Sequence, residues 1–234
     1  MVFITGDKHG DFSAIEDFCA THITRKEDDI MIILGDHGCN YLGPLNRTSR
    51  KRLASFPLTF LLVRGNHDRR VTSPPMRQIL YETPSFRGVV LQEPSFPNIL
   101  HAIDGGRYHL EGRSAVVIGG AYSPDKHYRL AMQSAGYGKY YWFEDEQLSA
   151  EEMTDIEQRM RKDPPHLILS HTCPASYTPI HSPTFTDVDR TMENWMDKLE
   201  RTIPYKLWFC GHWHVNEVHG RVHLLYDDIF TLHR

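Results

Sequence analysis

Short apolar runs alternate with turns of glycine and polar residues along the whole chain. Runs of bulky or β-branched residues that end at such turns are typical of buried β-strands. The predicted strands are Val2–Thr5, Ile30–Leu34, Leu58–Val63, Ala115–Ile118, Leu167–Leu169 and Leu207–Cys210.

Helical patterns occupy several of the segments between these strands. Ser13 and Glu16 have the spacing of a capping box, as do Ser149 and Glu152, so each serine is predicted to cap a helix. The clearest helix spans residues 187–203, where apolar residues recur on one face. Strands that alternate with helices predict an α/β fold.

We expect a single domain over residues 1–234. The length suits one large domain, and 40% hydrophobic with 24% charged residues is typical of a globular protein. Residues 123–146 depart from the strand–helix pattern because they are polar, aromatic and poorly periodic. This segment is predicted to be a lid or insertion within the domain.

Charge and cysteine content indicate which partners and which cellular compartment to expect. Twenty-six Lys and Arg against thirty Asp and Glu give a net charge of −4, which argues against a DNA-coating protein but leaves a local nucleic-acid patch open. No apolar run approaches the roughly 18 residues of a membrane span, so no membrane partner is expected. The start of the chain lacks a signal-peptide pattern, and the four cysteines lack disulfide or CxxC spacing. A cytoplasmic location with reduced thiols is therefore expected.

Side chains that can bind metals stand where the predicted strands end. Ligands of open α/β sheets bind at this carboxyl edge, so residues from distant parts of the chain can meet there. The seven donors are Asp7, His9, Asp36, Asn66, His171, His212 and His214. Oxygen and imidazole donors in this number suit two divalent cations, and an aspartate can bridge them. No cysteine is required, which argues against a structural zinc site.

These donors belong to short motifs that follow one another in a distinctive order. The motifs are Asp7-x-His9, Gly35-Asp36, Gly65-Asn66-His67-Asp68, Ser170-His171 and Gly211-His212-x-His214. In this order they resemble the signature of the calcineurin-like metallophosphoesterases, over nearly the whole chain. The stretch from Gly119 to Arg129, followed by Trp142 and Glu146, looks like a small bacterial and phage subgroup of that superfamily. The resemblance implies a four-layer α/β/β/α sandwich with a dinuclear metal site at the strand carboxyl ends.

The resemblance also implies a role for each motif residue. One metal ion would be held by Asp7, His9, Asp36 and His214, and the other by Asp36, Asn66, His171 and His212. His67 would be the general acid beside the leaving group. A hydroxide that bridges the two ions would attack the phosphate ester directly. Mn²⁺ is the preferred cofactor because mixed oxygen and imidazole ligands suit it, while iron, nickel and zinc stay open.

The sequence defines the substrate less sharply. Protein phosphatases of the superfamily carry Gly-Asp-x-x-Asp-Arg-Gly, whereas residues 35–41 here lack its second carboxylate and its arginine. We therefore expect a small phosphate ester or a nucleotide, monoester or diester, and nucleic acid is not favoured. Asn66, Lys126 and Arg129 are the candidates for contacting the substrate. The alternative is a catalytically silent scaffold that keeps the fold and binds partners, and the oligomeric state stays open.

Overall fold

The computed structural model describes residues 1–42, 46–71, 76–138, 140–179 and 188–233. All six predicted strands are confirmed, each within two residues of its expected bounds. They are β1 (Val2–Thr5), β2 (Ile30–Ile33), β3 (Thr59–Leu62), β8 (Arg113–Ile118), β9 (Leu167–Ser170) and β10 (Leu207–Cys210).

Further strands in the described part complete one curled sheet. They are β4 (Arg77–Thr83), β5 (Phe86–Gln92), β6 (Ile99–His101), β7 (Arg107–Leu110), β11 (Glu217–His219), β12 (Val222–Leu224) and β13 (Phe230–Leu232). The order is β11-β12-β10-β9-β8-β7-β5-β6-β3-β2-β1-β13, with β4 paired to β5. Each half is built on four parallel strands with one antiparallel strand at its edge, β13 or β11. The antiparallel strands β5 and β7 join the halves. β7 pairs with Phe86–Gly88 of β5 and β6 pairs with Leu91 and Gln92, so the two halves of the sheet meet along successive stretches of β5.

The described helices are α1 (Ser13–Thr21), α2 (Arg47–Ala54), α3 (Lys126–Ser134), α4 (Ala150–Lys162) and α5 (Thr191–Thr202). The capping box at the start of α4 is confirmed. The Ser149 hydroxyl accepts from the Glu152 N–H at 3.2 Å, and the Glu152 carboxylate accepts from the Ser149 N–H at 2.7 Å.

The other two predicted helix starts need correction. Ser13 does not cap α1, because it lies in the first turn and its own N–H donates to Asp11 Oδ1 at 3.0 Å. The helix predicted from residue 187 begins at Thr191, whose N–H donates to Asp189 Oδ1 at 2.9 Å. Residue 187 itself lies outside the described residues.

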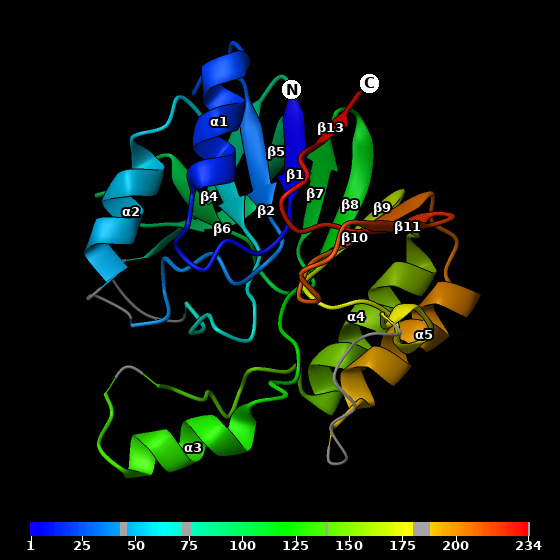
Figure 1. The fold of residues 1–234 in the computed structure, drawn as a ribbon. Coiled ribbons are helices and arrows are strands. Elements are labelled where there is room, and N and C mark those ends of the chain that lie inside the picture. Colours follow the sequence, from blue (N-terminus) through cyan, green and yellow to red (C-terminus); the bar gives the residue numbers. More distant parts are fainter. Residues whose placement is uncertain (43–45, 72–75, 139, 180–187, 234) are drawn as a thin grey trace.

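Alternating side chains of the strands divide the core into separate layers. In β1, Val2 enters a central cluster that also holds Val117 of β8, so this cluster lies between the two half-sheets. Phe3 points to the opposite face and packs with Ile15 of α1. In the other half-sheet, Trp208 of β10 faces a third cluster built with α4 and α5. Figure 1 shows α1 and α2 on one side of the sheets and α4 and α5 on the other, which confirms the four-layer α/β/β/α sandwich.

Residues 123–138 and 140–146, called the arm from here on, leave this sandwich and return to it. The arm contains α3, a helix that the sequence pattern did not reveal. Figure 1 shows α3 set apart from the other four helices, below the sheets. The role of this segment as a lid stays a prediction.

Candidate metal site

The seven predicted donors converge at one edge of the sandwich, because each follows a strand. Asp7 comes after β1, Asp36 after β2, Asn66 after β3, His171 after β9, and His212 and His214 after β10, while His9 lies two residues beyond Asp7. Asp7, Asp36 and His171 are buried, whereas the His9 and His214 side chains are 36% and 46% exposed. The site is therefore open to solvent on the side of these two histidines.

Asp7, His9 and His214 form one group of potential ligands. Their ligand atoms all lie within 4.8 Å of one another. His214 Nε2 is 3.3 Å from Asp7 Oδ2 and 3.1 Å from His9 Nε2. Asp7 Oδ2 is buried and accepts no hydrogen bond from any residue that the structure describes. A divalent cation would satisfy this buried oxygen and the two imidazole nitrogens together.

Asp36, Asn66 and His171 form a second group, deeper in the protein. His171 Nδ1 lies 2.7 Å from the carbonyl oxygen of Leu34, which can only accept, so Nδ1 carries the ring proton. His171 Nε2 lies 2.8 Å from Asn66 Oδ1 and 3.7 Å from Asp36 Oδ1. An imidazole nitrogen without a proton, an amide oxygen and a carboxylate oxygen this close together are donors that could hold a cation. The His212 ring lies beside that of His171, with the centroids 4.9 Å apart.

The backbone at the site is held in a conformation that side chains other than glycine rarely adopt. Five described residues other than glycine have positive φ, and four of them are predicted donors. The φ angles are 47° at His9, 45° at Asp36, 69° at His212 and 52° at His214. Such strain clusters at functional sites, where the surrounding structure enforces it. At Gly35 a side chain would collide with the His171 ring, so the glycine makes room for that donor.

Burial and neighbouring charges set the protonation of the donors. Burial raises the pKa of Asp36 well above its usual range, and the carboxylates of Asp7 and Asp68 add to this effect. Burial acts to raise the pKa of Asp7 as well, but the imidazoles of His171 and His214 outweigh it and lower that pKa. Burial lowers the pKa of His212 to about 3, so this ring is neutral near pH 7 and able to bind a metal.

His67, the predicted general acid, lies at the border between the donors and the arm. Its N–H donates to Asp36 Oδ1 at 2.7 Å, and its ligand atom also falls within 4.8 Å of those of His9 and Asp36. Arg129 of α3 is buried and donates to His67 Nε2. Burial and the Arg129 charge lower the pKa of His67 to about 2. Lys126, in contrast, lies with its ammonium 4.1 Å from the centroid of the Trp142 ring.

Three further residues at the site were not among the predicted site residues. Asn66 Nδ2 donates to Ser123 Oγ at 2.9 Å, and the Ser123 N–H donates to Glu146 Oε1 at 2.9 Å. Buried Arg64 donates to the backbone oxygen of Glu146 at 2.7 Å. Ser123 and Glu146 belong to the stretch that resembles the phage and bacterial subgroup, and this resemblance is the sequence feature that could have identified them as site residues.

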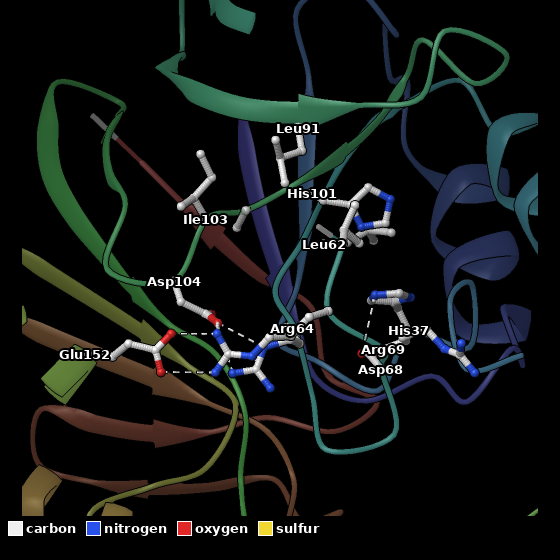
Figure 2. A pocket seen from close by; sticks show the side chains of 13 residues that line it. His37, Leu62, Arg64, Asp68, Arg69, Leu91, His101, Ile103, Asp104 and Glu152 are labelled. Carbon is white, nitrogen blue, oxygen red and sulfur yellow. Dashed lines mark hydrogen bonds and ion pairs between the residues drawn. The ribbon is translucent and has the colours of Figure 1, made fainter. Parts of the chain in front are cut away.

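A cavity of about 220 Å³ lies behind the turn that carries Asn66 and His67. Its described lining residues include Asp68, His37 and His101, and they include none of the seven donors. Figure 2 shows Asp68 facing His37, with Asp68 Oδ2 3.3 Å from His37 Nε2. The cavity thus borders the candidate metal site but is not part of it.

The donor set and the four-layer fold define a known class of protein. The family model of calcineurin-like phosphoesterases matches residues 1–216, so the chain belongs to this metal-dependent family. A solved phosphopantetheinyl hydrolase from Mycobacterium tuberculosis has a similar structure, with a TM-score of 0.50 and 12% sequence identity. The match covers 96% of this chain and 87% of that chain, and at this identity it shows the fold alone. Among proteins of curated function, no sequence matches this chain.

Phosphoester hydrolysis is the general activity that follows from family membership. No helix in the described part of the chain is long and apolar enough to cross a membrane.

Proposed function

We propose that the protein hydrolyses a small phosphate ester or a nucleotide with the help of two divalent metal ions, Mn²⁺ being preferred. The observation that carries this proposal is the convergence of buried carboxylates and imidazole nitrogens at one sheet edge. Family membership supports the reaction class, and mixed oxygen and imidazole ligands suit Mn²⁺ while leaving iron, nickel and zinc as alternatives. The complete donor set weighs against the silent scaffold.

In this proposal the two ions share Asp36. Asp7, His9 and His214 complete one set of ligands, and Asn66, His171 and His212 complete the other. The buried Asp7 Oδ2, which accepts no hydrogen bond from any described residue, supports the first set, and the approach of His171 Nε2 to Asn66 Oδ1 supports the second. When bound, the ions would lower the pKa of a water molecule and neutralise charge on the phosphate.

The protein residues around the ions would orient the ester and supply a proton. Asn66 and Arg129 are proposed to contact the phosphate, with Lys126 further along α3. Arg129 now donates to His67 Nε2, so an incoming phosphate would compete with His67 for this guanidinium. Release of Arg129 would leave His67 Nε2 free to carry the proton that the departing oxygen needs.

We also propose that the protein acts in the cytoplasm. All four cysteines, each in the described part, are free, which fits a reducing compartment.

The test is a panel of p-nitrophenyl phosphate, bis-p-nitrophenyl phosphate and cyclic nucleotides, each with Mn²⁺, Ni²⁺, Mg²⁺ or Zn²⁺. We expect turnover that needs the added metal and that is lost in Asp36→Asn with an unchanged circular dichroism spectrum. The panel also separates monoesters from diesters. Metal-independent hydrolysis, or full activity in Asp36→Asn, would refute the proposal.

A further inference from the structure

A chain of buried hydrogen bonds runs from a proposed metal ligand to the base of the arm. Asn66, Ser123 and Glu146 are 1%, 0% and 3% exposed. Asn66 Nδ2 lies 2.9 Å from Ser123 Oγ, which lies 2.5 Å from Glu146 Oε2. The Ser123 backbone N–H donates to the other carboxylate oxygen, Glu146 Oε1, at 2.9 Å. Because these residues are buried, their polar atoms depend on one another for hydrogen bonds.

Counting these protons determines which way the Asn66 amide faces. In its ionised form Glu146 only accepts, and both of its oxygens accept from Ser123, so the single hydroxyl proton of Ser123 then points to Glu146. Ser123 Oγ can then only accept from Asn66, and the nitrogen of the amide is its only donor. The NH₂ group of Asn66 must therefore face Ser123, which turns Oδ1 toward His171.

This orientation matters because an amide can rotate by half a turn and fill the same space with oxygen and nitrogen exchanged. In the rotated form Asn66 would present an NH₂ group, which cannot bind a cation, to the proposed metal site. We infer that Ser123 and Glu146 are positioning residues that hold Asn66 Oδ1 in place as a metal ligand. The inference rests on the proposed function, since it assigns a use to the oxygen that the chain orients.

The same contacts connect the arm to the metal site. Ser123 and Glu146 are the first and last residues of the arm, so their hydrogen bonds close its base. Arg64, two residues before Asn66, donates to the backbone oxygens of Glu146 at 2.7 Å and Gly119 at 3.2 Å. A rearrangement at the arm base would therefore release Asn66 and weaken one metal site without touching any other ligand.

The first test is calorimetric titration of the metal-free, full-length protein with Mn²⁺. Ser123→Ala should weaken one of the two binding events by about 10–100-fold, as loss of an outer contact of a ligand does, and should leave the other unchanged. Glu146→Gln keeps the shape but puts an NH₂ group against one of the two Ser123 donors, so it should also weaken that event. Glu157→Gln is the matched control, because Glu157 pairs with Arg161 and Lys198 away from the arm, and it should bind Mn²⁺ like the wild type.

A double-mutant comparison separates orientation from simple support of the arm. In Asn66→Asp both side-chain atoms are oxygens, so rotation no longer changes the ligand. Adding Ser123→Ala to Asn66→Asp should then change Mn²⁺ affinity by no more than about twofold, the scatter of independent sites. Losses that add in full, or wild-type affinities in both Ser123→Ala and Glu146→Gln, would overturn the inference and leave the proposed function intact. Failure of the wild type itself to bind Mn²⁺ would overturn the proposed function and the inference with it.

Discussion

If His67 is the general acid, the loss of rate on replacing it should depend on the leaving group of the ester. A nitrophenolate departs without a proton, whereas an alkoxide such as a ribose oxygen needs one. His67→Ala should therefore slow hydrolysis of an alkyl or nucleotide ester by about 10²–10⁴, or about 3–5 kcal/mol of barrier, and slow a nitrophenyl ester far less. The hydrogen bond to Asp36 comes from the backbone N–H of residue 67 and survives the substitution, so metal content should stay unchanged. Arg129 loses one acceptor but keeps Asp125, which limits the secondary effect on binding.

The assay compares single-turnover rates at saturating Mn²⁺ for the two kinds of ester, so that product release does not hide the chemical step. The control is His127→Ala. His127 is an exposed histidine of α3, the helix that carries Arg129, and its replacement should alter neither rate. Equal losses on both esters would show that His67 binds the phosphate or stabilises charge instead. Loss of a metal ion would show that His67 is a ligand, as its distance to His9 and Asp36 would allow.

Further predictions concern the metal ions, the arm and the fold. Metal analysis of the saturated wild type should return close to two ions per chain and that of Asp36→Asn fewer, because this carboxylate serves both sites; a single ion in active wild type would contradict the assignment. Arg129→Ala should raise KM for phosphate esters more than it lowers kcat, and Lys126→Ala should do so more weakly because Lys126 lies over Trp142; unchanged KM in both variants would remove α3 from the substrate site. Ser149→Ala should lower the free energy of unfolding by about 0.5–2 kcal/mol in chemical denaturation with Mn²⁺ affinity unchanged, and no loss of stability would mean that the capping box is not a net contributor.

Features that depend on a short stretch of sequence could be predicted. The six apolar strands were found because each is buried on both faces, and the donors were found because each lies within four residues after the end of such a strand. The capping box at Ser149 is likewise a local pattern. Ser13 has the same pattern, yet the helix begins one residue earlier than the box requires, and Asp11 accepts the hydrogen bond from its N–H.

Features that depend on distant partners could not be predicted. The strand β4 alternates between exposed and half-buried positions, so its pairing with β5 determines that it is a strand. Ser123 and Glu146 are 57 and 80 residues from Asn66 along the chain, and only the folded chain brings the three together. The contact between Arg129 and His67 arises in the same way, because it depends on how the arm returns to the body.

The positive φ angles of His9, Asp36, His212 and His214 also affect the stability of the metal-free protein. At about 1–2 kcal/mol each, four such residues together represent a sizeable part of the 5–15 kcal/mol by which domains are ordinarily stable. A newly made chain must fold against this strain with no ion to compensate for it. Metal supply would then govern how long each molecule survives as well as how fast it works, since the metal-free form is the one most often unfolded and open to proteases. Selection for stability alone would favour glycine at these four positions. The protein would then become more stable but would lose four of its proposed metal ligands.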